Sequence, residues 1–380
     1  MIRLSVPDID DQDLRAIERI VETGFLIQGP LVQKFEETFK QRTHSLFASA
    51  LTNCTAALQI GLLSKGIIPG DKVLVTSYSW LSTANAIELC GAIPIFVDID
   101  PRTFNLCPKD LERVISNEKK EGSLKKIKAI LPVHTFGLMA DMPSILEIAQ
   151  NNDLFVIEDA ACALGSTLNG KHAGSWADIG CFSFHPRKAI TTGEGGMIVC
   201  DDPEIDRNVK ALRNHGMDPH SAQPQFILPG FNCRMTEFQG AFGISQLTKF
   251  DGILEKRKTL AKRYKDIIRQ LDLPLQTPSE PEGFKHSYQS YVVLLPKKFN
   301  VDKRSALIKK MREDGVEVQI GTYHMPLTHY FKNKYNFKEG DFPNTDDVYS
   351  RTLSLPLFSS LTIDQQEKTI LALKLNLEKI

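Results

Sequence analysis

The sequence Cys181-Phe182-Ser183-Phe184-His185-Pro186-Arg187-Lys188-Ala189-Ile190-Thr191-Thr192-Gly193-Glu194-Gly195-Gly196 places one lysine between two apolar segments that favour β-strands. Residues 179–184 predict a strand that ends before Pro186, and residues 197–200 predict the next one. Burial on the intervening turn would lower the pKa of the Lys188 ammonium, because desolvation disfavours the charged form. A partly deprotonated lysine is a nucleophile towards carbonyl compounds. From this stretch alone, a surface lysine in a hairpin loop is an equally acceptable interpretation.

Composition excludes several classes of protein. The 46 Lys and Arg residues balance the 46 Asp and Glu residues, which gives no reason to expect a nucleic-acid or anionic-membrane surface. The N-terminus has no signal-peptide core and no apolar run is long enough to span a membrane, so we expect a cytoplasmic protein. The seven cysteines form no CxxC pair and the nine histidines show no ligand spacing, so we expect no disulfide framework and no metal site.

Strands and helices are predicted to alternate through the first 200 residues. The continuous apolar segments are Lys72–Thr76, Ile93–Val97, Ile127–Val133 and Leu154–Ile157, and helical patterns lie between them. This order predicts an α/β fold in which helices sandwich a mostly parallel sheet of the seven-stranded type. Ligands bind at the carboxyl ends of the strands in such sheets, which draws attention to Trp80, His134 and Asp159.

Two helices near the N-terminus are predicted from local patterns. Residues 10–23 form an amphipathic pattern, with Leu14, Ile17, Ile20 and Val21 on the face that we expect to be buried. Residues 53–55, Asn-Cys-Thr, precede a helix rich in alanine and leucine. The N–H groups at such a helix start suit a phosphate group, although an ordinary capped helix explains the pattern more simply.

The C-terminal third predicts a separate α+β unit. One helical pattern runs from Thr236 to about Leu271 and becomes strongly charged from Lys249 onward. After it, short strands (290–295 and 316–320) alternate with helices (304–312 and 363–373). We therefore predict a large α/β domain at residues 1–250 and a small α+β domain at residues 251–380.

Asp159 ends a strand that is otherwise apolar up to Glu158. A carboxylate in that position is costly unless it meets a cation or hydrogen-bond donors. The protonated pyridine nitrogen of pyridoxal 5'-phosphate (PLP) would be such a partner. A helix-capping or ion-paired aspartate is an equally acceptable interpretation of this residue alone.

Further short motifs follow in a fixed order along the chain. They are Gly29-Pro30 with Phe35-Glu36, Asn53-Cys54-Thr55-Ala56-Ala57-Leu58, Ser77-Tyr78-Ser79-Trp80, Val97-Asp98-Ile99-Asp100, Val133-His134, Glu158-Asp159-Ala160-Ala161, the segment from Phe182 to Gly196 already quoted, Arg213-Asn214-His215-Gly216, Gly230-Phe231-Asn232-Cys233-Arg234-Met235 with Glu237 and Gln239, and Ser354-Leu355-Pro356-Leu357. With these motifs, nearly the whole chain resembles the DegT/DnrJ/StrS family of PLP-dependent nucleotide-sugar aminotransferases, which have fold type I.

The resemblance implies a role for each matching residue. Lys188 would form the Schiff base with PLP and then act as acid and base at the substrate carbon. Asp159 would pair with the pyridinium nitrogen, and Trp80 would stack on the ring. The phosphate would be held by Cys54, Thr55 and Ser183. Asn232 would reach the phosphate from the neighbouring subunit, which implies a homodimer with shared active sites.

Two residues depart from the family pattern. Cys162 stands where many relatives have Gln or His near the ring hydroxyl of PLP, so its contact with the cofactor is left open. Gln289 stands where a histidine is common, and this change affects the expected sugar site.

The implied reaction moves the amino group of L-glutamate to a nucleotide-linked keto-sugar, with a 4-keto-6-deoxy sugar as the expected class. The amino sugar would enter a surface polysaccharide or a glycosylated metabolite. His185, Tyr323 and His324 are candidate substrate contacts. The sequence specifies neither the sugar, the nucleotide nor the ring carbon. The alternatives are a PLP-dependent sugar dehydratase, whose relatives carry histidine where Lys188 stands, and a non-catalytic regulatory protein of the same fold.

Overall fold

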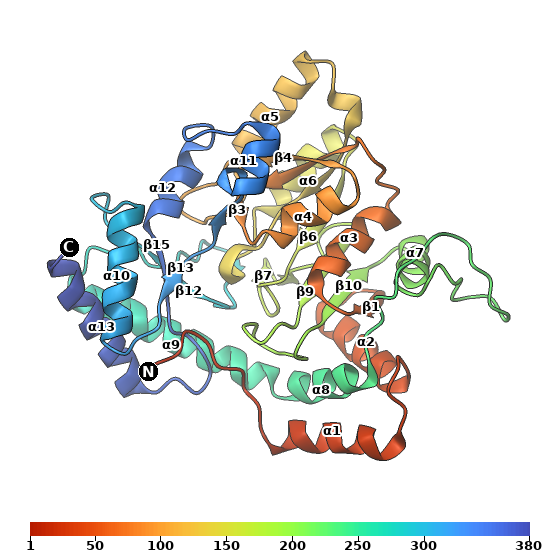
Figure 1. Ribbon diagram of the computed structural model, residues 1–380, viewed down its shortest axis with the longest axis horizontal. Coiled ribbons are helices and arrows are strands. Elements are labelled where there is room, and N and C mark those ends of the chain that lie inside the picture. The colour runs from red at the N-terminus through yellow and green to blue at the C-terminus, as the bar shows by residue number, and fades with distance from the viewer.

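The computed structural model describes residues 1–380 and is built around a seven-stranded sheet with the order β1-β10-β9-β6-β5-β2-β4 (Figure 1). Its strands are β1 (Phe47–Leu51), β2 (Lys72–Thr76), β4 (Ile93–Val97), β5 (Ile127–Leu131), β6 (Phe155–Asp159), β9 (Ile179–Ser183) and β10 (Gly196–Cys200). Only β10 runs against the other strands, because it pairs antiparallel with both β1 and β9. The predicted fold class, an α/β protein with a mostly parallel sheet, is confirmed.

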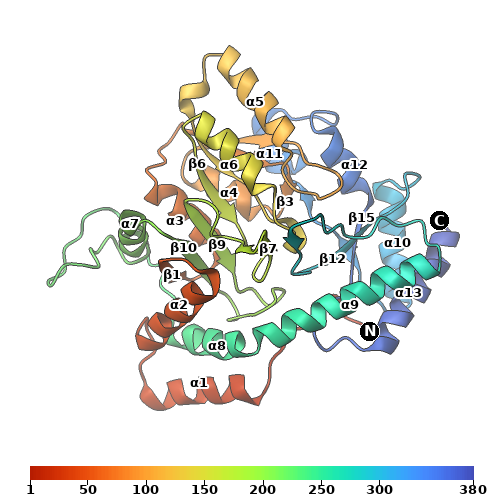
Figure 2. The same ribbon diagram turned by 180° about the vertical axis from the view of Figure 1, so that it is seen from behind.

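Helices cover both faces of this sheet, as Figures 1 and 2 show from opposite sides. Successive strand residues point to opposite faces, so Leu74 packs into one hydrophobic cluster while Val73 and Val75 pack into the other. The second cluster contains residues of α3 (Cys54–Ser64), α4 (Ser82–Leu89) and α7 (Pro203–Arg213). The first contains residues of α2 (Pro30–Thr43), α5 (Pro108–Lys120), α6 (Met142–Asn151) and α8 (Glu237–Thr248). Burial on both faces explains why the strands are continuously apolar.

The C-terminal elements form a third hydrophobic cluster beside the large sheet. Its helices are α9 (Phe250–Gln270), α10 (Val301–Glu313) and α13 (Ile363–Glu378), and its antiparallel sheet consists of β12 (Tyr291–Leu294), β15 (Thr352–Leu355) and β13 (Gln319–Ile320). The N-terminal residue Ile2 packs into the same cluster and pairs with Val316. The division at residue 250 stays a prediction.

Smaller elements link the two parts of the chain. Strand β3 (Tyr78–Ser79) pairs with β14 (Tyr323–His324), and α11 (His329–Tyr335) and α12 (Pro343–Arg351) follow β14. A second small sheet consists of β7 (Thr167–Leu168), β8 (Lys171–His172) and β11 (Phe284–Lys285). None of the helices combines the length and the apolar character needed to cross a membrane.

The prediction of one long helix from Thr236 to Leu271 is wrong. The chain forms α8 and α9, and Lys249 between them leaves helical geometry with φ −103° and ψ 1°. At this break the Lys249 amine lies 2.7 Å from the Asp13 carboxylate and 3.0 Å from the Asp10 carboxylate. Phe250 is fully buried directly after it. These contacts stabilise the change of direction at a position where the sequence shows only a continuing helical pattern.

The buried face predicted for the first helix is also partly wrong. In α1 (Asp11–Thr23), Leu14 and Val21 are 55% and 65% exposed, whereas Ile20 and Asp13 are buried. Asp13 is buried because its carboxylate accepts hydrogen bonds from the Lys249 amine and the Gln246 amide at 2.7 and 2.9 Å. An ion pair, rather than the apolar stripe, therefore sets the orientation of α1.

Candidate active site

Lys188 lies on the loop between the paired strands β9 and β10. The loop closes on itself, because the N–H of Phe184 donates to the Gly195 carbonyl at 2.9 Å and the N–H of Thr192 donates to the Phe184 carbonyl at 3.0 Å. The Thr191 hydroxyl also donates to the Phe184 carbonyl, at 2.9 Å. The turn therefore provides hydrogen-bond partners for its own backbone groups and holds Lys188 at a defined place.

Lys188 lines a small cavity together with Cys162, Ser183 and Gln289. Its Nζ donates a hydrogen bond to the Cys162 sulfur at 3.1 Å. Burial lowers the pKa of the Lys188 ammonium, but the neighbouring Cys162, Cys54 and Asp159 side chains outweigh that effect and leave the pKa above its usual value. The lowered pKa expected from the sequence is therefore wrong for the protein without cofactor, because the sequence does not show which groups face the amine.

Asp159 is the last residue of β6 and is only 3% exposed. Its Oδ2 accepts a hydrogen bond from the Thr83 hydroxyl at 2.8 Å, and its Oδ1 accepts one from the N–H of Ala161 at 3.1 Å. Burial raises the pKa of this carboxyl, and the two donors and the charge of Lys188 offset only part of the effect. The site therefore holds a buried carboxylate whose hydrogen-bond donors and neighbouring positive charge do not fully compensate its burial.

Thr83 is a site residue that the sequence analysis missed. It lies in the first turn of α4, and its hydroxyl also lies 3.1 Å from the Ser79 hydroxyl. A threonine near a helix start usually indicates a cap. Nothing in the sequence connects it to a carboxylate 76 residues away.

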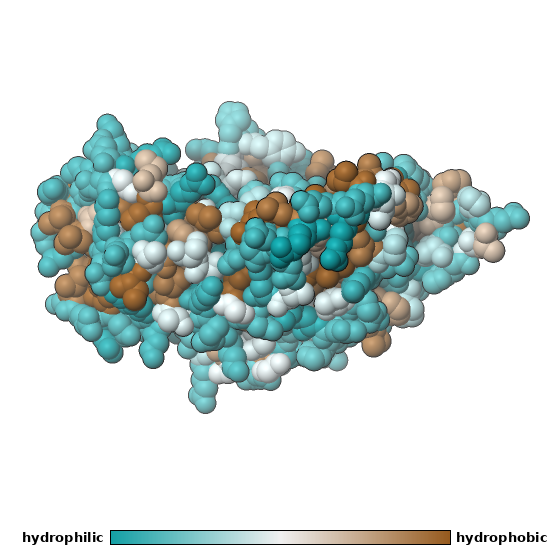
Figure 3. All heavy atoms as spheres, turned by 90° about the horizontal axis from the view of Figure 1, so that it is seen from below, coloured by the Kyte–Doolittle hydropathy of each residue, from teal (hydrophilic) through white to brown (hydrophobic).

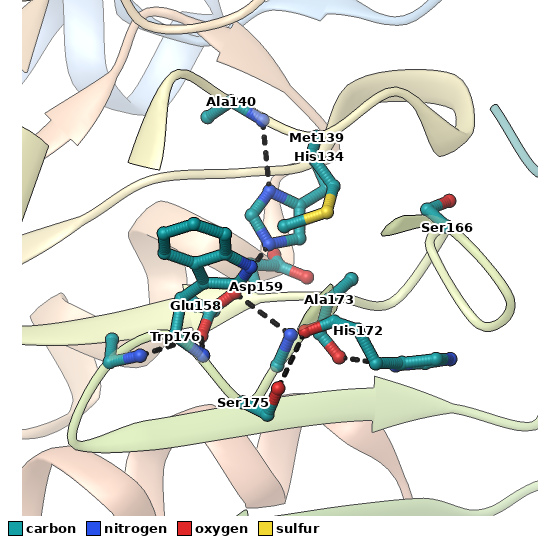
Figure 4. A network of polar contacts seen from close by, with 12 residues as sticks. His134, Met139, Ala140, Glu158, Asp159, Ser166, His172, Ala173, Ser175 and Trp176 are labelled. Carbon is teal, nitrogen blue, oxygen red and sulfur yellow. Dashed lines mark hydrogen bonds and ion pairs between the residues drawn. The ribbon is translucent and has the colours of Figure 1, made fainter. Parts of the chain in front are cut away.

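Glu158 and His134 form a buried network beneath Asp159, which Figure 4 shows. The Glu158 carboxylate lies 2.8 Å from His134 Nε2, and it also accepts the N–H groups of Gly174, Trp176 and Ala177 at 2.7–2.9 Å. His134 Nδ1 accepts the N–H of Ala140 at 3.1 Å, so Nε2 carries the proton. His134, which the strand-end rule placed near the ligand, is therefore a structural residue that holds the end of β6.

The start of α3 has the features of a phosphate site. Asn53 caps the helix by accepting the N–H of Ala56 at 2.9 Å, and the first N–H groups of the helix, from Cys54 and Thr55, have no partner within it. A Cβ at Gly196 would lie 2.5 Å from the Asn53 carbonyl, so only glycine permits this close approach of β10. Because Gly196 pairs with Ser183, the Ser183 hydroxyl and the helix start belong to one region.

Trp80 lies at the rim of this region, between β3 and α4. Its side chain is 61% exposed, and its ring packs edge-on against Tyr323 with a centroid distance of 5.5 Å. The Trp80 carbonyl accepts the N–H of Thr83 at 3.2 Å, which connects the exposed ring to the residue that binds Asp159. The exposed indole face is available to pack on a planar ligand.

The other predicted residues lie at varied positions around the site. Asn232 is exposed and forms no side-chain hydrogen bond within this chain, and the Cys233 carbonyl beside it accepts the N–H of Thr52 at 3.0 Å, just before α3. His185 Nδ1 accepts the N–H of Arg187 at 3.2 Å. His324 is buried with its Nε2 2.9 Å from Asp346, whereas its neighbour Tyr323 is exposed. Their substrate contacts stay predictions.

Other motif residues hold the fold together. The Glu237 carboxylate accepts the N–H groups of Gly29, Leu31 and Val32 at 2.9–3.0 Å. Glu36 forms a buried ion pair with Arg213 at 2.5 Å. These motif residues do not line the cavity. They connect α2 to α7 and α8.

The residues around the cavity fit PLP. A lysine amine, a buried carboxylate, a helix start with free N–H groups and an exposed aromatic ring surround one region, and each matches a different part of that cofactor. No group of three or more His, Cys, Asp or Glu side chains is arranged to hold a metal ion.

Comparison with known proteins shows the family of this chain. Residues 7–374 match the model of the DegT/DnrJ/EryC1/StrS aminotransferase family, and the chain belongs to this family. It is 36% identical to the spore coat polysaccharide biosynthesis protein SpsC of Bacillus subtilis, over 97% of this chain and 95% of that protein. It is 34% identical to GDP-perosamine synthase of Caulobacter vibrioides, over 98% and 97% of the two chains.

Solved structures show the same fold with the cofactor. A DegT/DnrJ/EryC1/StrS aminotransferase from Brucella abortus superposes with a TM-score of 0.88 and 30% identity, over 96% of this chain and 95% of that one. The PLP form of the putative sugar aminotransferase Spr1654 from Streptococcus pneumoniae gives a TM-score of 0.92 and 25% identity, over 100% and 99% of the chains. The predicted family, the enzyme class of PLP-dependent sugar aminotransferase and the cofactor are confirmed.

Proposed function

We propose that this protein transfers the amino group of L-glutamate to a nucleotide-linked keto-sugar of the 4-keto-6-deoxy class. The observation that carries this proposal is that the Lys188 amine and the buried Asp159 carboxylate lie close enough for each to shift the pKa of the other. The similarity to GDP-perosamine synthase supports a nucleotide-linked sugar as the acceptor. The similarity to SpsC supports a product used in polysaccharide biosynthesis.

The proposed role of Lys188 is to bind the cofactor and to move a proton at the substrate carbon. Bound PLP supplies an aldehyde that combines with amines and a ring that withdraws electrons from the reacting carbon. Since the pKa of Lys188 is raised in the protein without cofactor, the amine has to lose a proton before it reacts. Proton transfer by one positioned amine contributes about 10²–10⁴-fold to such a reaction.

The other residues bind and orient the cofactor in this proposal. Asp159 would hold a proton on the ring nitrogen, because a carboxylate favours a neighbouring cation. Thr83 would keep the Asp159 carboxylate in place through its 2.8 Å hydrogen bond. Trp80 would cover one face of the ring, and the helix start at Cys54 and Thr55 would bind the phosphate together with Ser183. Cys162 would face the lysine rather than the ring hydroxyl.

We also propose a homodimer in which Asn232 completes the partner's site. The segment between α7 and α8 projects from the body of the molecule in Figures 1 and 2. It exposes Phe226, Ile227 and Phe231, and the segment 25–27 exposes three more apolar side chains. Figure 3, seen from the side of α1, shows further hydrophobic groups between polar ones on that face. A second copy would bury this apolar surface.

We also propose a large domain at residues 1–250, a small domain at residues 251–380 and a cytoplasmic location. The division is supported by the separate hydrophobic cluster of the C-terminal elements.

A direct test uses glutamate labelled with ¹⁵N at its amino group. The purified protein is incubated with this donor, PLP and a panel of nucleotide-linked keto-sugars, and the products are analysed by mass spectrometry. We expect ¹⁵N in one of the sugars and none when Lys188→Ala replaces the wild-type protein. Loss of a sugar hydroxyl without gain of ¹⁵N would show a dehydratase instead.

A further inference from the structure

Three cysteines near Asp159 differ in their surroundings. Cys54 and Cys181 are buried, and burial raises the pKa of both thiols well above the usual value, with the charge of Asp159 adding to the effect. These two cysteines are therefore neutral thiols with little nucleophilic character. Cys162 is only half-buried and lines the same small cavity as Lys188. A small solute that enters the cavity meets the Cys162 sulfur.

The Lys188 amine contacts the Cys162 sulfur directly. The separation of Nζ and Sγ is 3.1 Å, and the amine donates the hydrogen bond. The thiolate is the nucleophilic form of cysteine. Neither Cys54 nor Cys181 has such a hydrogen bond from a cation. The position therefore combines a half-buried cysteine at the wall of the cavity with an amine close enough to bond to its sulfur.

We propose that Cys162 and Lys188 form a reversible sulfur–nitrogen cross-link in the cofactor-free protein, with a hydroperoxide as the oxidant. The Cys162 thiolate attacks one oxygen of hydrogen peroxide, the O–O bond breaks, and the departing hydroxide takes a proton from the Lys188 ammonium to become water. Sulfur is oxidised by two electrons to a sulfenic acid, and the peroxide is reduced.

The cross-link forms in a second step. The neutral Lys188 amine attacks the sulfenic sulfur, the S–N bond forms and the S–O bond breaks, and the hydroxyl leaves as water with a proton from the amine. Sulfenic acids are known to condense with nitrogen in this way. One thiol, one amine and one hydrogen peroxide thus give one sulfenamide and two waters. A thiol reductant attacks the sulfur and releases the amine again.

The consequence rests on the proposed function, in which Lys188 is the residue that binds the cofactor. A Lys188 nitrogen bonded to Cys162 cannot combine with PLP, so oxidation would block cofactor loading until a thiol reverses it. Conversely, PLP bound to Lys188 would protect the pair, because the amine is then occupied. Cys162 would give this chain a peroxide-sensitive loading step.

The test compares the full chain with and without cofactor after treatment with hydrogen peroxide. Each sample is digested without reductant and analysed by peptide mass spectrometry. We expect the peptides that contain Cys162 and Lys188 to be joined with the loss of two hydrogen atoms, only in the cofactor-free sample. Peptides with Cys54 and Cys181 should remain unmodified, and dithiothreitol should separate the joined peptides. Cofactor loading, measured by visible absorbance, should fall in proportion to the cross-linked fraction and recover after reduction.

Variants make the result decisive. After peroxide, Cys162→Ser and Cys162→Ala should each load cofactor to their own untreated level, whereas Cys200→Ser should lose loading as the wild type does. Absence of the cross-link, stable oxidation of Cys162 with Lys188 free, or equal loss of loading in the Cys162 variants would overturn the inference. A different result would overturn the proposed function, namely that Lys188→Ala binds the cofactor with the visible spectrum of the wild type.

Discussion

Replacing Asp159 with asparagine should stabilise the cofactor-free protein and weaken its binding of PLP. Asp159 is 3% exposed, and burial raises its pKa, so the charged carboxylate is less favourable in the folded protein than in water. Asparagine removes this charge but keeps the shape of the side chain. Its oxygen can accept the N–H of Ala161, and its NH₂ can donate to the Thr83 hydroxyl, which is then free to donate to Ser79.

The expected gain in the free energy of unfolding is about 0.5–2 kcal/mol, the range usual for a single stabilising substitution. For 380 residues this gain corresponds to a rise in melting temperature of roughly 1–3 °C. The loss of the charged partner of the ring nitrogen should cost cofactor binding about 2 kcal/mol or more, a reduction in affinity of about 30-fold or more.

The assay is thermal unfolding of both cofactor-free proteins from neutral to acidic pH. Because the pKa of Asp159 is higher in the folded than in the unfolded protein, the wild type becomes less stable than the variant as the pH rises through the folded-state pKa. The difference should therefore be largest at neutral pH and vanish in acid. Thr83→Val keeps the charge but removes a donor, so it should destabilise by about 1.5–3 kcal/mol. An Asp159→Asn variant less stable than the wild type at neutral pH would refute this reasoning.

Three further predictions concern catalysis, assembly and folding. Lys188→Ala should abolish amino transfer while its melting temperature stays close to that of the wild type. Turnover that continues at the wild-type rate would show that another residue is the nucleophile. Asn232→Ala should weaken cofactor affinity, and mixing its subunits with Lys188→Ala subunits should restore one complete site per dimer; activity that does not recover would exclude shared sites. Glu158→Ala should lower the free energy of unfolding by about 3–5 kcal/mol in urea titrations, because four donors lose their buried acceptor. As a control, replacement of the exposed Glu37 by alanine should change the free energy of unfolding little. Similar effects of the two variants would contradict the role of the Glu158 network.

Local sequence patterns predicted the large sheet well. The bounds of Lys72–Thr76 and Ile93–Val97 agree with β2 and β4, because both strands are short apolar runs. The break at Lys249 was missed, since its cause is an ion pair with Asp10 and Asp13 more than 230 residues earlier. Periodicity within one segment carries no information about such a partner.

The same limit applies to the candidate site. Lys188 and Asp159 could be found from the sequence because Asp159 ends an apolar strand and Lys188 lies on the short loop between two apolar strands. The hydrogen bonds from Thr83 to Asp159 and from Lys188 to Cys162 could not be found, because they depend on which helix starts and loops meet at the sheet edge. The raised pKa of Lys188 is a consequence of those contacts.

Attachment of PLP to Lys188 is the step on which every other proposed role depends. Borohydride reduction of the purified enzyme makes the bond between PLP and its lysine permanent, and peptide mass spectrometry then locates the added mass. The account predicts the cofactor on the peptide that contains Lys188 and on no other. Cofactor on a different lysine, or a purified PLP-containing enzyme with Lys188 unmodified after reduction, would contradict it.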